Sequence, residues 1–429
     1  MSKRSVNAGM RAKKKPVARV ARARAPRTAR TEWPIEVQGS DTLPLGMPAA
    51  DFLRDYWQKR PLLIRNAFPG FESPLSPEDL AGLACEDGVL ARIVAHEPGH
   101  DKWMLRHGPF PEEMFPAMPH HDWTLLVQDV DKWDADVRAL LERFDFLPRW
   151  RIDDVMISFA APGGSVGAHV DQYDVFLLQG LGHRRWQIDN RAATTGIAPP
   201  VHFRLDVELR LLQRFTPDHE WVLGPGDMLY LPPGVPHHGV AEDACLTYSI
   251  GMRAPSAAEL LGDFVDTLAG EADEAQRYRD PDLAPPKDAN EIDAAAMQRA
   301  IEALNVLRMN DPERLGNWFG RFITLYRSAG EAAPPQQTRS RIEVEWDLQQ
   351  GAVLHRHPWT RMAWRRSGNQ ARLYVAGQDF LMPVRDAQRI AAAGSLDRDT
   401  YAALSDAGCD VVQALLGGGH YALVLPDAD

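Results

Sequence analysis

Two side chains that commonly bind metal ions stand two residues apart in the segment GAHVDQYDVFLLQ, where His169 precedes Asp171. The segment is strand-like, and alternate residues of a strand point to the same face. The imidazole and the carboxylate are therefore expected to converge. A third ligand is available in PGDMLYLPPGVPHHG from His237 or His238, and the spacing does not choose between them. Two histidines and one carboxylate on one face of a metal ion are typical of non-haem Fe(II) oxygenases.

The context of the pair strengthens this interpretation. A His-x-Asp pair alone is a weak signal, because a histidine at the end of a strand is often only hydrogen-bonded. Here the pair lies among short extended runs separated by Gly and Pro, between residues 153 and 253. Such a pattern predicts an antiparallel barrel or sandwich, and the histidines after the Pro-Gly turn follow at a distance that suits a later strand.

The segment HRRWQI contains an arginine that we expect to be buried. Strand alternation places Arg184, Trp186 and Ile188 on one face, and Arg185 and Gln187 on the other. If the apolar pair marks the inner face, the guanidinium of Arg184 is buried beside it and needs an anion. A carboxylate of the protein or a bound acid would serve. In an Fe(II) oxygenase the acid would be 2-oxoglutarate, whose distal carboxylate suits the planar guanidinium.

The flanking segments must position these residues. Residues 48–68 predict a helix followed by a strand, and residues 256–326 return to helical spacing. A linker is expected at residues 331–338, and residues 342–429 mix strands with a helix, as in a small α+β module.

Composition limits the class of protein. The chain has 429 residues, 45% of them hydrophobic and 25% charged, which suits two or three soluble domains. It has no apolar run of the roughly 18 residues that a membrane span needs, so we expect no membrane contact. Its three cysteines form no CxxC pair, which argues against a disulfide framework and a thiolate zinc site. We expect a cytoplasmic protein.

Charge is distributed unevenly along the chain. The tail, residues 1–31, has eleven Lys or Arg and no acid, whereas the remainder has 37 basic and 59 acidic residues, a net charge of −22. We expect the tail to be disordered. It is a solvated extension, a segment similar to a transit peptide, or a contact for RNA. The acidic body favours encounter with a basic partner.

Four segments occur in one order: FLRDYWQKRPLLIRNA, HVDQYDVFLLQG, HRRW and PGDMLYLPPGVPHHG. Together they resemble the bacterial ribosomal oxygenases of the JmjC type, the ribosomal-protein arginine hydroxylases. The resemblance runs from about Trp33 onward; the basic tail lies outside it. It implies an α+β protein with a double-stranded β-helix (JmjC/cupin) core, a helical dimerisation segment and a C-terminal winged-helix-like module. The corresponding ranges are 1–31 for the tail, 32–255, 256–330 and 331–429.

The resemblance also assigns roles to residues. It implies that His169, Asp171 and His237 bind Fe(II) and that Arg184 binds 2-oxoglutarate. The adjacent His238 departs from the family pattern and leaves room for a shifted or auxiliary ligand. The weaker candidates are polar residues of neighbouring strands or of the segment after the His-x-Asp pair. They are Ser158 and Thr247 for 2-oxoglutarate, and Tyr173, Asp154 and Ser249 for the substrate. For each of these, ordinary strand packing or hydrogen bonding is the alternative.

The activity implied by the resemblance is hydroxylation of an arginine β-carbon in a large-subunit ribosomal protein, the sixteenth in the conventional count. It consumes O₂ and 2-oxoglutarate, and a homodimer is implied. The alternatives are hydroxylation of a histidine or of another protein, and a non-catalytic cupin-like module for ribosome assembly. A small-molecule oxygenase would not need the acidic surface and the two additional modules. A lysine demethylase would need a cage for methylammonium, for which the sequence has no clear signal.

Overall fold

The computed structural model describes residues 33–191, 201–275, 277–285, 288, 290–305, 311–325 and 332–425. The predicted disordered tail, residues 1–31, lies outside these ranges. None of the described helices is both long enough and apolar enough to cross a bilayer.

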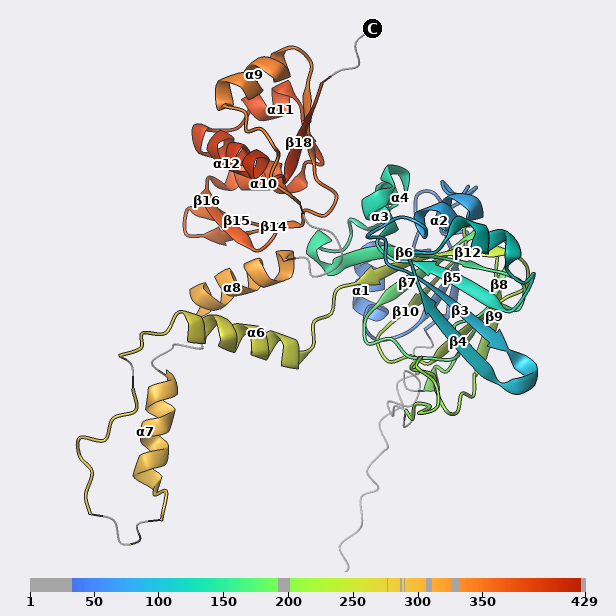
Figure 1. The fold of residues 1–429 in the computed structure, drawn as a ribbon, viewed down its shortest axis with the longest axis horizontal. Helices are drawn as coiled ribbons and strands as arrows, with labels where there is room; N and C mark the ends of the chain where they lie inside the picture. The colour runs from blue at the N-terminus through green and yellow to red at the C-terminus, as the bar shows by residue number, and fades with distance from the viewer. Residues whose placement is uncertain are drawn as a thin grey trace, which may run out of the picture. The chain divides into compact units, whose positions relative to one another are not determined.

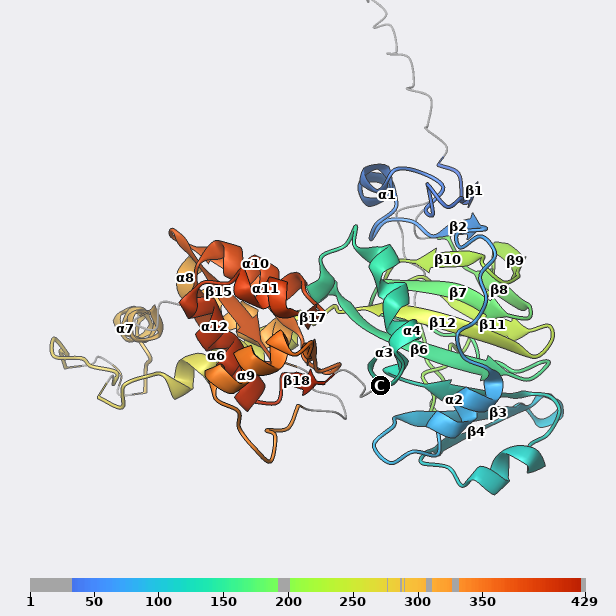
Figure 2. The same cartoon turned by 90° about the horizontal axis from the view of Figure 1, so that it is seen from above.

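The chain up to Met252 forms two β-sheets (Figures 1 and 2). The larger sheet has the strand order β1-β2-β10-β7-β12-β6-β5-β3-β4, and the smaller has the order β11-β8-β9. The strands are β1 (Glu36–Gln38), β2 (Leu62–Arg65), β3 (Ala91–Glu97), β4 (Lys102–His107), β5 (Trp123–Val127), β6 (Ile152–Ala160), β7 (Val175–Leu181), β8 (Arg184–Ile188), β9 (His219–Leu223), β10 (Met228–Leu231), β11 (His237–Ala241) and β12 (Cys245–Met252).

The two sheets pack on each other through apolar side chains. Leu63, Leu177 and Leu229 of the larger sheet share one buried cluster with Trp186 and Ile188 of the smaller sheet. In β8 the burial alternates as predicted, with residues 184, 186 and 188 buried and residues 185 and 187 half-buried. This arrangement is the predicted double-stranded β-helix, in which the space between two sheets holds the site.

Short helices cover the outer face of the larger sheet. They are α1 (Ala49–Asp55), α2 (Pro77–Leu83), α3 (Val130–Trp133) and α4 (Ala135–Ala139), with a 3₁₀ turn over Leu140–Phe144. Phe52 of α1 lies against Phe176 and Tyr230, with ring centroids 5.8 and 5.0 Å apart. The predicted helix and strand of residues 48–68 are therefore present. The helix packs on β7 and β10, and the strand β2 pairs with β10 in the sheet.

Three helices follow the sheets: α6 (Ala257–Gly270), α7 (Ala294–Asn305) and α8 (Pro312–Thr324). Ser256 caps α6 through a capping box with Glu259. The predicted helical spacing is confirmed. On α7 the apolar side chains of Met297, Ile301 and Leu304 share one face and are exposed.

The C-terminal module contains two three-stranded sheets, ordered β17-β13-β18 and β14-β15-β16. Its buried cluster joins strands to helices through Leu354, Leu373, Ile390 and Leu415. The elements are α9 (Arg341–Gln349), β13 (Val353–Arg356), β14 (Met362–Ser367), β15 (Gln370–Val375), β16 (Gln378–Met382), α10 (Val384–Ala392), β17 (Ser395–Leu396), α11 (Arg398–Ala402), α12 (Asp406–Gly417) and β18 (Tyr421–Val424). The predicted α+β character is confirmed.

Candidate active site

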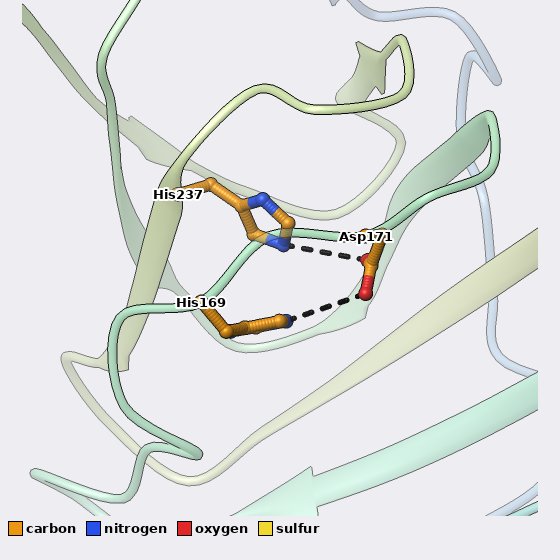
Figure 3. Close-up of side chains that lie close together, drawn as sticks. All are labelled: His169, Asp171 and His237. Atoms are coloured by element: carbon orange, nitrogen blue, oxygen red, sulfur yellow. Dashed lines mark ion pairs between the residues drawn. The ribbon is translucent and has the colours of Figure 1, made fainter. Parts of the chain in front are cut away.

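His169, Asp171 and His237 point toward one another (Figure 3). His169 forms an isolated β-bridge with His237, and each backbone N–H donates to the other residue's carbonyl at 3.0 Å. Asp171 lies in an irregular segment, because β7 begins only at Val175. The expectation that one regular strand carries the pair was wrong. A bridge between segments 68 residues apart brings the side chains together instead.

The three side chains form a group suited to a metal ion. One ligand atom from each lies within 4.8 Å of the others. Nε2 of His237 is 3.6 Å from one carboxylate oxygen of Asp171, and Nε2 of His169 is 4.0 Å from the other. Nδ1 of each imidazole lies 2.9 Å from a backbone carbonyl, that of Gly167 or Val235. When Nδ1–H donates there, the lone pair of Nε2 faces the shared point, as metal binding requires.

Electrostatics favour a neutral His237. Burial, together with the nearby His169, lowers the pKa of His237 to about 4. Its imidazole is therefore neutral near pH 7, the form that binds a metal ion.

The neighbouring histidine has a different environment. Nε2 of His238 lies 3.0 Å from the hydroxyl oxygen of Ser165, and its ring packs edge-on against Phe215. Successive residues of β11 point to opposite faces. The structure thus brings His237, and not His238, to His169 and Asp171.

Arg184 is a buried cation with weak partners. It is only 3% exposed. Its Nη atoms donate at 3.4 Å to the hydroxyl of Ser158 and to the carbonyl of Gly239, and its Nε has no partner. A Cβ at Gly239 would lie 2.7 Å from that Nε, so glycine makes room for the guanidinium. Within the described ranges no carboxylate pairs with it. A buried guanidinium in this state is suited to an anion from outside the protein.

All nine predicted site residues line one cavity of about 690 Å³. The three candidate metal ligands and Arg184 share it with polar groups from two adjacent strands. Ser158 of β6 pairs in register with Thr247 of β12. The full set is Asp154, Ser158, His169, Asp171, Tyr173, Arg184, His237, Thr247 and Ser249.

Comparison with known proteins decides the family. Residues 139–260 match the model of the JmjC domain, and residues 307–422 match the ROXA-like winged helix. The chain is 39% identical over 337 residues to the ribosomal protein uL16 3-hydroxylase of Escherichia coli, covering 79% of this chain and 86% of that protein. The chain belongs to the JmjC-type ribosomal oxygenases.

Other members of the family agree with this assignment. A probable ribosomal oxygenase of Haemophilus influenzae is 41% identical over 233 residues, 54% of each chain. The solved structure of the Escherichia coli ribosomal oxygenase YcfD in complex with cobalt and 2-oxoglutarate matches with a TM-score of 0.75 and 35% identity. It covers 88% of this chain and 98% of that one. The match with a YcfD complex of cobalt and succinic acid has the same TM-score, with 36% identity. The predicted fold, including the winged helix, is thereby confirmed.

The hydroxyl of Thr247 is already engaged in this ribosomal oxygenase. Gln179 is fully buried, and its Nε2 donates to the carbonyl of Leu181 at 2.9 Å. Its Oε1 therefore accepts, and Thr247 donates to it at 3.1 Å. A carboxylate bound beside Thr247 would have to replace Gln179 as the acceptor of the Thr247 hydroxyl group.

The surroundings of Asp154 and Tyr173 at the cavity raise the pKa of both side chains. Burial and the nearby carboxylates of Asp129 and Asp153 raise the pKa of Asp154 to about 7. Tyr173 is 42% exposed. Burial of its hydroxyl and the Asp171 carboxylate raise the pKa of Tyr173, so it remains a neutral phenol that can donate a hydrogen bond.

The sequence reasoning missed Asp174, whose carboxylate is fully buried three residues after Asp171. It accepts hydrogen bonds from the hydroxyl of Tyr230 at 2.6 Å, from Nε2 of Gln58 at 2.9 Å and from Nη2 of Arg151 at 3.3 Å. An acid just before a run of apolar strand residues was the available signal. Asp174 holds the end of the irregular segment that carries Asp171.

Replacing Asp174 by asparagine is expected to weaken metal binding by about tenfold, because loss of a group that orients a ligand typically costs 10–100-fold. The asparagine side chain keeps the shape of the aspartate, but its NH₂ group is a donor at a position toward which three other donors already point. Titration of Co²⁺ followed by its visible absorption measures the affinity. Tyr230→Phe removes one of the three donors to Asp174 and also the acceptor of the Gln58 backbone N–H. It keeps the carboxylate, so it is the matched control and should have a smaller effect. Wild-type affinity in Asp174→Asn would contradict the role.

Proposed function

We propose that this protein is an Fe(II)- and 2-oxoglutarate-dependent oxygenase that hydroxylates the β-carbon of an arginine in ribosomal protein uL16. The observation that carries the proposal is one cavity with a His-Asp-His group and a buried arginine that has no carboxylate partner within the described ranges. The first suits Fe(II), and the second suits the carboxylate of a co-substrate. The 39% identity to a uL16 3-hydroxylase supports the choice of substrate.

We assign His169, Asp171 and His237 as the ligands of Fe(II). Their donor set fits this ion, because imidazole and carboxylate on one face leave positions for 2-oxoglutarate and O₂. When these are bound, the metal centre couples oxidation of 2-oxoglutarate to succinate and CO₂ with hydroxylation of an unactivated C–H bond. The carbonyls of Gly167 and Val235 keep both imidazoles oriented throughout.

Arg184 is assigned to bind the distal carboxylate of 2-oxoglutarate. Its guanidinium lines the cavity and is desolvated, so a paired carboxylate gains strong, directional hydrogen bonds. Ser158, 3.4 Å from Nη1 of Arg184, and Thr247 on the paired strand complete this subsite. Apolar walls, including Leu177 and Trp186, exclude water from it.

Asp154, Tyr173 and Ser249 are assigned to the substrate. The carboxylate of Asp154 would accept hydrogen bonds from a substrate guanidinium, and the phenol of Tyr173 is exposed enough to contact it. Ser249 follows Thr247 by two residues on β12, so it lies on the same face of the strand. Positioning one carbon close to the metal decides which atom is hydroxylated.

Activity should rise with pH through the titration of Asp154. Its pKa of about 7 means that most of the carboxyl groups are protonated at pH 6 and ionised at pH 8. Because the ionised form binds a cation, kcat/KM for the protein substrate should rise roughly tenfold over this range. The pH profile of succinate formation measures it. In Asp154→Asn the rise should disappear, and a profile unchanged from wild type would contradict the assignment.

The mass of the ribosomal protein tests the proposed function directly. Cells lacking this gene receive either the natural protein or its His169→Ala variant, and uL16 is analysed by intact mass and peptide mapping. We expect one additional oxygen on a single arginine, restored only by the natural protein. If uL16 is identical in the cells lacking the gene and in both complemented strains, while the purified protein still forms succinate, the enzyme class stands and the substrate is wrong. The map would also reveal a hydroxylated histidine.

The remaining assignments belong to the same proposal. We assign residues 32–255 to catalysis, residues 256–330 to homodimer formation and residues 331–429 to the winged helix. The exposed apolar face of α7, with Met297, Ile301 and Leu304, supports the dimer. The eleven basic residues of the tail support a contact with ribosomal RNA in the cytoplasm.

A further inference from the structure

A second cavity, of about 410 Å³, lies away from the metal ligands. Helix α4 contributes Arg138, the turn before β6 contributes Arg149, and the end of β13 contributes Arg356. Arg361, in the loop after β13, fixes one wall, since its Nη2 donates to the carbonyl of Asp153 at 2.8 Å. Four guanidinium groups therefore surround one hollow.

Two acids of this cavity, the buried Asp131 and the half-buried Asp153, are already paired with cations. Asp131 pairs with Lys132 and also accepts the backbone N–H of Val155 at 2.8 Å. Asp153 pairs with Arg361. The third acid of the lining, Glu142, is exposed. Arg149 pairs with Asp145, outside the lining, at 2.9 Å, so Arg138 and Arg356 are the arginines that these carboxylates leave uncompensated.

Two of the arginines have no carboxylate partner anywhere in the described part of the chain. Arg138 donates only to backbone carbonyls, those of Asp131 at 2.8 Å and Lys132 at 3.2 Å. Arg356 donates only to the carbonyl of Ala391 at 3.2 Å. Both keep further N–H groups for another acceptor.

The arginines are also close enough to repel one another. Burial lowers the pKa of Arg356, and the positive charges of Arg149 and Arg138 lower it further. Arg138 lowers the pKa of His357 in the same cavity, after burial. Like charges that converge in a partly desolvated hollow destabilise the protein unless an anion lies between them.

We propose that this cavity is a binding site for a phosphate group, held by the guanidinium groups of Arg138 and Arg356. Phosphate offers several acceptor oxygens and up to two negative charges, and it matches the planar fork of arginine. The group belongs either to a free phosphorylated small molecule or to the backbone of a nucleic acid. The site is distinct from the metal centre, since none of the three metal ligands lines it, and Asp153 is the residue that borders both cavities.

Calorimetric titration with inorganic phosphate tests the proposal. The full-length protein carries Fe(II) and saturating 2-oxoglutarate without oxygen, so that Arg184 is occupied. We expect Arg356→Gln and Arg138→Gln each to weaken phosphate binding by about tenfold. Because they come from different elements, α4 and β13, one variant suffices if the other fails to fold. Arg398→Gln is the matched control, as this exposed arginine of the C-terminal module lies outside the cavity.

Three outcomes would overturn the site: no phosphate binding, equal loss in Arg398→Gln, or loss in Arg184→Gln without loss in Arg356→Gln. The last would place the anion in the active site. A ten-nucleotide single-stranded RNA separates the two sources. RNA that competes with phosphate and binds tenfold less well to Arg356→Gln indicates a nucleic acid backbone. Phosphate binding that needs Arg356 while RNA binding does not indicates a small molecule.

Discussion

Asp171→Ala is expected to abolish turnover and metal binding. Asp171 is the single carboxylate of the group and faces Nε2 of both His169 and His237. Removing an orienting partner outside the ligands already costs about 10–100-fold, so loss of a ligand should lower turnover by more than about a thousandfold. Succinate formation measures turnover, and Co²⁺ absorption measures metal binding. His169→Ala should behave in the same way.

The matched control for this prediction is His238→Ala. This variant removes the adjacent imidazole, which bonds to Ser165 instead of facing Asp171. We expect metal affinity within a few fold of wild type and a modest loss of stability. Near-normal turnover in Asp171→Ala, or loss of metal in His238→Ala, would show that the metal ion lies elsewhere.

Arg184→Met is expected to raise the KM for 2-oxoglutarate by about 30-fold or more, with metal affinity unchanged. Removing one partner of a buried charge pair costs about 2–5 kcal/mol, and each 1.4 kcal/mol corresponds to about tenfold. The kinetics of succinate formation at varied 2-oxoglutarate measure KM. Arg184→Lys keeps the charge without the planar fork, so its KM for 2-oxoglutarate should lie between those of wild type and Arg184→Met.

Arg184→Met should also be more heat-resistant than wild type in the absence of metal and co-substrate. The Arg184 guanidinium is buried with no carboxylate partner in the described ranges, and replacing an uncompensated buried charge with an apolar side chain of similar volume is often stabilising. A rise in Tm on the order of a few °C is expected by calorimetry. A lower Tm together with an unchanged KM would show that the arginine serves the fold alone.

The fold could be predicted largely from local patterns. Alternation in β8 placed Arg184 on the buried face beside Trp186, and the structure has it there. Apolar spacing located α6, α7 and the α+β module, because apolar residues that recur with the period of a helix or strand mark one face of that element. The irregular segment of Asp171 could not be predicted, since its composition is that of a strand, while its backbone hydrogen bonds are with His237 of β11 and with Gly234.

The sequence alone determined which chemical groups are present: a His-x-Asp pair, two later histidines and one arginine on an apolar face. Tertiary structure decided which of them meet. The bridge between His169 and His237 brings His237, and not His238, to the site, and the packing of β6, β8 and β11 leaves Arg184 without a carboxylate partner among the described residues. The reason is physical. Periodicity reports the direction of a side chain within its own element, whereas contacts between strands far apart in the chain depend on how the sheets pair and pack.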